Sequence, residues 1–179
     1  MDRLVTRRGT PGTLAGAAGA WLLFFAGPAM ADPVECLWNA LPAEKREIVV
    51  ASSEWEAFTN EDFERGRVAC KLSDAEFGAV VGGTAGYASE MRGVRWFSTR
   101  GISQAQLEAA FEEVRPGVRA AMAIEVLDQR ANALRPLIAR FLARIGVGKD
   151  DEANGGGRAA VYYLAGRDMR LNYRVATVS

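Results

Sequence analysis

Acidic residues next to aromatic ones are the first candidates for chemistry in this sequence. Glu54 and Glu56 flank Trp55, and Glu90 lies close to Trp96. Glycosidases work with one carboxyl group as acid and a second as base or nucleophile, and an aromatic ring beside an acid suits a sugar site. The same pattern is typical of an ordinary helical surface, which is the interpretation we prefer. We assign no catalytic residue and keep a carboxylate-based hydrolase of cell-wall glycan as the alternative function.

The absent residue types exclude most other catalytic centres. The chain has no histidine, which removes Ser-His-Asp and Cys-His catalysis and the usual zinc and haem ligation. Two cysteines cannot complete a structural zinc site by themselves. The sequence also lacks the Cys-x-x-Cys, Gly-x-Ser-x-Gly and Ser-x-x-Lys motifs. We therefore expect a non-enzymatic protein with no cofactor and no metal.

The segment GVGKDDEANGGGR, residues 146–158, contains half of a calcium-loop pattern. Asp150, Glu152 and Asn154 occupy alternate positions, as calcium ligands do. The twelfth position is Val161, where a calcium loop needs a bidentate glutamate. We predict that residues 146–158 are instead a flexible polar linker before the C-terminal segment.

Cys36 and Cys70 are the only cysteines of the chain. In an oxidising envelope compartment, an even number of cysteines favours a structural disulfide. Closing a loop of about 35 residues would add roughly 4 kcal/mol of stability in the chain-entropy model. Two buried free thiols are the expectation if the protein stays in the cytosol, so the compartment decides the state of this pair.

The first 31 residues have the composition of a signal peptide. Three arginines precede a mostly apolar stretch, Leu14 to Ala26, and Ala29-Met30-Ala31 fits the small-x-small pattern that signal peptidase recognises. A membrane span needs about 20 apolar residues, and this run approaches that length only if glycines and a proline are counted. We predict cleavage between Ala31 and Asp32, which removes residues 1–31. An uncleaved anchor in the inner membrane, with the domain facing the periplasm, is the alternative.

The remaining residues, 32–179, are sufficient for one domain. Three of the 22 basic and one of the 22 acidic residues precede the cleavage site, which leaves a net charge of −2. A general nucleic-acid or anionic-membrane binder would show a basic excess. We expect a periplasmic or secreted accessory or binding module without nucleic acid or strong membrane binding. Its partner would be an unidentified protein or an apolar ligand.

The elements that must position any site are predicted to be helical almost throughout. We predict an all-α, single-domain helical bundle of about five or six helices. Helix starts are expected where a capping residue or a proline precedes a periodic apolar segment. They lie at Asp32-Pro33, at Pro42, at Thr59 or Asn60, at Ser73 with Glu76, and at Ser103 with Gln106.

The longest apolar repeat predicts one long kinked helix over residues 117–146. Its apolar residues are spaced alternately by four and three positions from Ala120 to Ile145, which is typical of helices packed side by side. Pro136 lies off this stripe and can kink the helix. We expect the helix to be the spine of a monomer, and a homodimer that shares the stripe is the alternative.

The segment FGAVVGGTAGYA, residues 77–88, has a glycine at every fourth position. We predict that Gly78, Gly82 and Gly86 form one face that packs closely against another helix. The string resembles a glycine zipper, a motif of some membrane-associated proteins. A helix broken at Gly82-Gly83 and a role in membranes or self-assembly are the alternatives.

The C-terminal segment has mixed periodicity. Residues 159–164 are predicted to be helical, whereas Leu171, Tyr173 and Val175 alternate as in a strand. An isolated strand is poorly stable, so a helix is our first prediction. The conformation of residues 165–179 stays open at this point.

Overall fold

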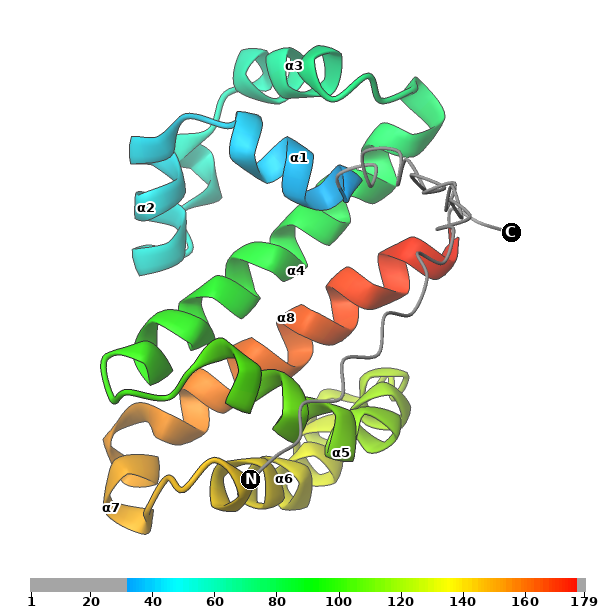
Figure 1. Ribbon diagram of the computed structural model, residues 1–179. Coiled ribbons are helices and arrows are strands. Elements are labelled where there is room, and N and C mark those ends of the chain that lie inside the picture. Colours follow the sequence, from blue (N-terminus) through cyan, green and yellow to red (C-terminus); the bar gives the residue numbers. More distant parts are fainter. Residues whose placement is uncertain (1–31, 177–179) are drawn as a thin grey trace, which may run out of the picture. The chain divides into compact units, whose positions relative to one another are not determined.

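Residues 32–176 are described by the structure, a computed structural model, and they are all-α as predicted (Figure 1). The predicted signal peptide and Ala31 lie outside the described residues, so the cleavage prediction stays a prediction. The elements, in chain order, are α1 (Pro33–Ala40), α2 (Ala43–Ser52), the 3₁₀ turn η1 (Trp55–Ala57), α3 (Asn60–Ala69), α4 (Asp74–Ser98), α5 (Gln104–Met122), α6 (Leu127–Arg144), α7 (Lys149–Asp151), the π turn η2 (Glu152–Gly156) and α8 (Gly157–Ala176).

Four helices, α1, α3, α4 and α5, begin where a local side chain satisfies their first backbone N–H groups. The Asp32 carboxylate accepts a hydrogen bond from the Val34 N–H at 3.2 Å and caps α1. Three later helices begin with a capping box, in which the two side chains satisfy each other's backbone N–H groups. These boxes are Thr59 with Asp62, Ser73 with Glu76, and Ser103 with Gln106.

The long helices α4 and α8 lie side by side and antiparallel, and glycines bring their backbones together (Figure 1). A Cβ atom added at Gly93 would lie 2.7 Å from the Tyr163 Cβ, and one added at Gly86 would lie 2.8 Å from the Gly166 carbonyl oxygen. Such distances are far shorter than normal carbon contacts. Glycine is therefore required at these positions of α4 because a side chain would push the two helices apart.

The predicted glycine face is correct for Gly86 and wrong for Gly78 and Gly82. No atom lies within 4 Å of a Cβ built at either of these two positions. Residues four apart drift around a helix of 3.6 residues per turn, so a row of every fourth residue leaves the interface. In α4, the glycines that contact another helix are instead Gly83, Gly86 and Gly93, which are separated by three and seven residues.

The predicted long helix over residues 117–146 is also wrong, because the chain folds back between α5 and α6. α5 ends at Met122 and α6 begins at Leu127. The reversal lets α6 bury Leu134 and Phe141 against the same core that α5 lines. A continuous helix would carry these side chains away from that core. The N-terminal part of the apolar stripe is not buried, and Leu127 is 72% exposed.

The segment predicted as a flexible linker, residues 146–158, is mostly helical. It forms α7, η2 and the start of α8. Gly155 has a φ of +108°, a left-handed conformation that glycine adopts without steric strain. This residue turns the chain into α8, which runs as a helix to Ala176. The strand alternative for the C-terminal segment is therefore wrong up to that residue.

The apolar core is largest between α4, α5, α6 and α8. Its aromatic members are Phe97, Phe111, Phe141 and Tyr163, all fully buried. Two smaller clusters, one containing Trp38 and the other Leu37, pack α1, α2 and α3 against α4, and the second also includes Tyr173 of α8.

The predicted pair Cys36–Cys70 is at disulfide-bonding distance, with 5.9 Å between the Cα atoms, and it links α1 to the end of α3. None of the helices among residues 32–176 has the length and apolar character needed to cross a membrane.

Candidate functional site

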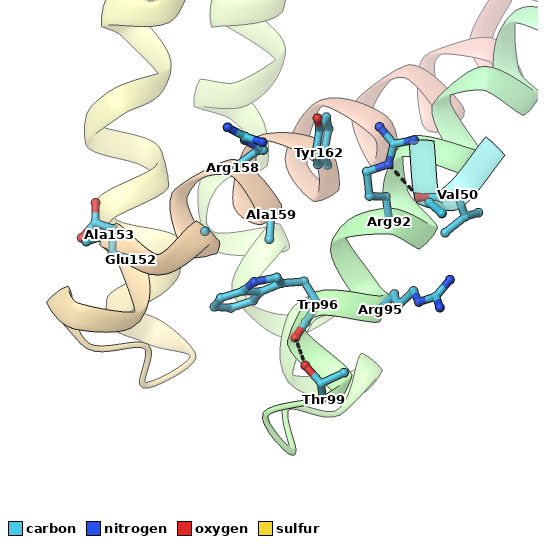
Figure 2. Close-up of a pocket in the computed structure, with 12 residues that line it drawn as sticks. Val50, Arg92, Arg95, Trp96, Thr99, Glu152, Ala153, Arg158, Ala159 and Tyr162 are labelled. Atoms are coloured by element: carbon cyan, nitrogen blue, oxygen red, sulfur yellow. Dashed lines mark hydrogen bonds between the residues drawn. The ribbon is translucent and has the colours of Figure 1, made fainter. Parts of the chain in front are cut away.

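A pocket of about 760 Å³ opens between α2, α4 and the start of α8 (Figure 2). Its lining combines arginines, aromatic rings and small apolar residues. The residues are Val50, Ala51, Arg92, Arg95, Trp96, Thr99, Glu152, Ala153, Gly155, Arg158, Ala159 and Tyr162.

Helical spacing brings the polar and aromatic side chains of this pocket together. Arg92, Arg95 and Trp96 of α4 and its C-cap residue Thr99 are spaced by three, one and three residues, which places them on one face at the end of this helix. On α8, Arg158 and Tyr162 are four residues apart and so lie on one face as well. The contact between α4 and α8 therefore joins two faces that are far apart in the sequence.

Arg92 connects the pocket to the end of α2. Its Nε donates a hydrogen bond to the Val50 carbonyl oxygen at 2.8 Å, and its Nη2 donates to the Val49 carbonyl oxygen at 2.5 Å. The Nη1 group donates to the Ser53 hydroxyl. The last carbonyl groups of a helix lack intrahelical partners, so this guanidinium caps α2. It also lies 4.8 Å from the centre of the Tyr162 ring.

Trp96 forms a wall of the pocket and is fixed from two sides. The Arg100 guanidinium lies 3.5 Å from the centre of the indole ring, and its Nε pairs with Asp151 at 3.5 Å. On another side, Cβ atoms added at Gly155 and Gly156 would lie 3.2 Å and 3.1 Å from indole atoms. The glycine-rich turn η2 thus packs its backbone against Trp96, which explains its irregular conformation.

The pocket has an excess of positive charge. Arg92, Arg95 and Arg158 line it together with a single described acidic residue, Glu152. Arg95 pairs with Glu47 at 3.0 Å, but both side chains are more than half exposed, and such pairs contribute little. Within the part of the chain that the structure describes, Arg158 makes no ion pair. Its positive charge is therefore available to a ligand.

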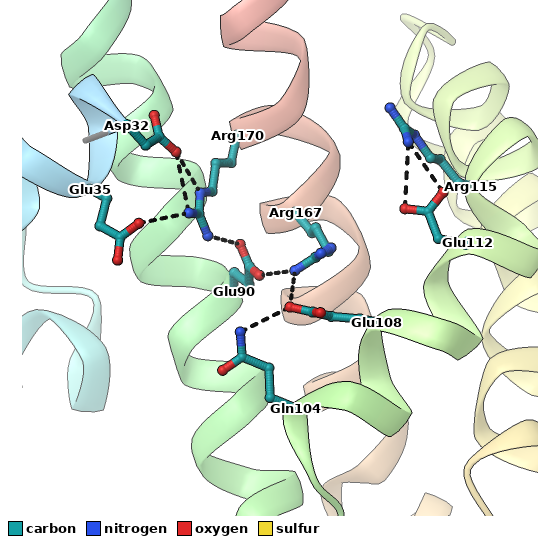
Figure 3. A network of polar contacts seen from close by, with 9 residues as sticks. All are labelled: Asp32, Glu35, Glu90, Gln104, Glu108, Glu112, Arg115, Arg167 and Arg170. Atoms are coloured by element: carbon teal, nitrogen blue, oxygen red, sulfur yellow. Dashed lines mark hydrogen bonds and ion pairs between the residues drawn. The ribbon is translucent and has the colours of Figure 1, made fainter. Parts of the chain in front are cut away.

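A second polar site, between α1, α4, α5 and α8, is occupied by its own ion pairs (Figure 3). The Glu90 side chain is 3% exposed and binds Arg167 at 2.7 Å and Arg170 at 3.3 Å. Arg170 also pairs with Asp32 at 3.2 Å and with Glu35 at 3.4 Å. A buried ion pair is tolerated only when both charges are matched. This network joins the start of α1 to α8.

The acidic residues considered as catalytic candidates are not brought together. Glu54, just before η1, and Glu56, within it, are exposed, whereas Glu90 is buried in the network of Figure 3. Trp96 belongs to the pocket of Figure 2, where Glu152 is the acidic neighbour. Among residues 32–173, no group of three acidic or cysteine side chains is placed to hold a metal ion.

Two aspartates have pKa values that their surroundings move in opposite directions. Asp62 accepts hydrogen bonds from Lys45 Nζ at 2.6 Å, from the Thr59 N–H and from Arg65, and these contacts hold its pKa well below the usual range. Burial raises the pKa of Asp168 on α8, against the smaller opposing effects of nearby arginines. Asn172 Nδ2 donates to its Oδ2 at 2.8 Å.

From the sequence we considered Trp96 only as a neighbour of Glu90 and Arg158 only as the last residue of the segment 146–158, and we did not single out Arg92 or Arg95. The spacing of Arg92, Arg95, Trp96 and Thr99 could have indicated a shared helical face. It could not have identified α8 as the opposite wall. Comparisons with protein-family models, with curated proteins and with solved structures found no match to this chain.

Proposed function

We propose that this protein is an exported, non-enzymatic binding module that holds a small ligand between α2, α4 and α8. The observation that carries the proposal is the pocket of about 760 Å³ with its aromatic, arginine and small apolar lining. Small-molecule sites are concave and mostly apolar, with a few polar groups that orient the ligand. The sequence prediction of an apolar ligand is thereby sharpened to a ligand of this pocket.

Export is supported by two independent features. Residues 1–31 carry the charge and apolar pattern of a signal peptide. Cys36 and Cys70 are at bonding distance, and disulfides persist mainly in oxidising compartments.

The non-enzymatic character is supported by the arrangement of the carboxylates. Glu90 is held between Arg167 and Arg170, which suits a structural role better than proton transfer to a substrate. Glu54 and Glu56 are exposed and lie outside the pocket lining. A glycosidase needs two carboxyl groups facing one bond, so the hydrolase alternative gains no support.

The export part is tested by the intact mass of the protein from a cell-envelope extract, with free thiols alkylated before any reduction. We expect a mass that begins at Asp32 and carries no alkyl group. A full-length mass with two alkylated thiols would contradict both export and the disulfide. A full-length mass without alkylation would instead favour the uncleaved anchor.

The binding part is tested with phenylnaphthylamine, an uncharged apolar dye whose fluorescence rises on transfer from water to a protein pocket. Ala51→Trp and Ala153→Trp place a large side chain at exposed positions of the pocket lining. We expect each to weaken dye binding at least tenfold. Ala139→Trp, at an exposed position of α6 outside the lining, is the matched control and should bind as the unmodified protein does. Equal binding by all three variants would disprove the pocket as the site.

A further inference from the structure

The charges around the pocket specify the kind of ligand more narrowly than its size does. We infer that the pocket binds a small aromatic anion, with its ring against Trp96 and Tyr162 and its negative group on Arg158. The inference rests on the proposed function, because it names the ligand class of the same pocket.

The negative group is assigned to the part of the pocket around Tyr162. Arg158 is exposed and is four residues from Tyr162 on the same face of α8. Arg92 covers the Tyr162 ring at 4.8 Å, so two positive charges flank one ring (Figure 2). Arginine recognises carboxylate and related oxyanions through its planar fork of N–H donors. An anion seated there gains from both charges.

The two arginines have different roles in this arrangement. Arg92 directs its nitrogens to Val49, Val50 and Ser53, so it contributes charge rather than a new hydrogen bond. Arg158 has no acidic partner among the described side chains and can donate directly to the ligand. Arg158 is therefore the residue to change, because its loss does not uncap α2.

The body of the ligand is assigned from the remaining lining. Trp96 and Tyr162 provide two ring surfaces, and the lining also contains small residues, among them Ala51, Ala153 and Gly155. Aromatic groups pair with rings in stacked or edge-to-face geometries that aliphatic chains do not share. A ring fits such a wall with less loss of conformational freedom than a flexible chain.

The inference is tested with anilinonaphthalene sulfonate, which adds a negative sulfonate to the ring system of phenylnaphthylamine. We expect the unmodified protein to bind the sulfonate about tenfold more tightly than the uncharged dye, a difference of about 1.4 kcal/mol. Arg158→Gln should remove most of this difference while it leaves the affinity for the uncharged dye unchanged.

Two further variants serve as controls for the effect of charge on dye affinity. Glu152→Gln removes the acidic residue of the described lining and should strengthen sulfonate binding about two- to threefold without affecting the uncharged dye. Arg140→Gln changes an exposed arginine of α6 outside the lining and should affect neither dye. Higher salt should weaken sulfonate binding in the unmodified protein more than in Arg158→Gln.

The ring is tested by displacing the sulfonate dye with naphthoate or octanoate, two carboxylates of different shape. We expect naphthoate to displace it at the lower concentration. Displacement at equal concentrations, or equal affinities for the charged and uncharged dyes, would overturn the inference while the pocket stands. If the tryptophan variants fail to block either dye, the proposed function itself falls.

Discussion

In the bundle of α4, α5, α6 and α8, large aromatic side chains such as Phe97, Phe111 and Phe141 are fully buried in one continuous core. The layer formed by α1, α2 and α3 is built differently. Its apolar clusters are smaller, and it is joined by Cys36–Cys70 and by charged contacts. Apolar burial scales with the area removed from water, so a thin layer of short helices gains less from it.

This difference indicates which contacts stabilise each region and where the proposed ligand binds. The bundle is stabilised mainly by its continuous apolar core, together with the buried Glu90 ion pairs between α4 and α8, whereas the α1–α3 layer depends more on a covalent link and on ion pairs. The pocket lies at the boundary, because α2 provides Val50 and Ala51 while α4 and α8 provide the arginines and rings. Conditions that loosen the layer should therefore weaken binding before they unfold the bundle.

The largest expected effect is a cavity in the bundle core. Phe141→Ala should lower the free energy of unfolding by about 3–5 kcal/mol, because the removed ring leaves a space that the close-packed core fills only in part. Phe58→Ala in the α1–α3 layer should lower it by less, because two of the rings that contact Phe58, those of Trp55 and Phe63, are partly exposed. Urea unfolding followed by circular dichroism measures both. A larger loss of unfolding free energy for Phe58→Ala than for Phe141→Ala would contradict the prediction that the bundle core contributes more to stability.

Removal of the disulfide comes next. The double change Cys36→Ser with Cys70→Ser should lower the free energy of unfolding by about 2–4 kcal/mol. Hydrogen exchange should accelerate in α1, α2 and α3, while the centres of α4 and α8 stay protected. Uniform acceleration over all helices would show that the two regions unfold as one unit. The single-site change Ala69→Ser, at an exposed position of α3, serves as a control for substitution within the linked segment.

Acid should affect the stability of the two regions differently, because each contains an aspartate and the two pKa values are shifted in opposite directions. The pKa of Asp62 is lowered in the folded layer, so its stabilising effect is complete above the unfolded pKa and is lost as the pH falls below it. Asp168 in α8 has a raised pKa, so it favours the folded state most at low pH and loses this contribution as the pH rises through the folded pKa.

The measurement is the unfolding free energy as a function of pH for Asp62→Asn and Asp168→Asn. Asp62→Asn should be less stable than the unmodified protein at neutral pH and should approach it in acid. Asp168→Asn should show the reverse, a relative gain as the pH rises. Parallel pH profiles for the two variants would contradict the opposite shifts.

The smallest effects distinguish the exposed from the packed face of α4. Gly82→Ala should raise the free energy of unfolding by up to about 1 kcal/mol, because alanine favours a helix interior over glycine and nothing lies near its Cβ. Gly86→Ala is the matched opposite and should destabilise, since its Cβ would meet the backbone of α8. Thermal unfolding of the two variants measures the difference. Destabilisation by Gly82→Ala would indicate a contact on that face.

The parts of the fold that were predictable depend on neighbours in the sequence. Ser73 and Glu76, or Ser103 and Gln106, form a capping box with residues only three positions apart, so the pattern is visible before folding. The disulfide was predictable for a different reason, since two cysteines allow one intramolecular pairing. The helical state of α8 was only a first preference, because its alternation over residues 171–175 also suits a strand.

The predictions that were wrong concern contacts between distant segments. The apolar stripe from Ala120 to Ile145 is continuous in the sequence, yet the chain reverses between Met122 and Leu127. The chain reverses there because the reversal buries Leu134 and Phe141 in the core that α5 also lines. In the same way, Gly78 and Gly82 are as regular as Gly86, but only the last faces α8.

The sequence by itself determined the helical class, the starts of α1 to α5 and the single cysteine pairing that is possible, Cys36 with Cys70. Caps and periodicity depend on residues close together in the sequence, and the cysteine pairing follows from there being two cysteines. Only the tertiary structure decided which glycines meet another helix, where the chain reverses, and that Arg92 and Trp96 share a pocket with Arg158 and Tyr162. The reversal depends on the packing of α6 against α5, and the glycine contacts and the pocket depend on the packing of α4 against α8, whose residues are separated by more than 50 positions along the chain. No local pattern encodes such a contact, because its free energy comes from surfaces that meet only in the folded protein.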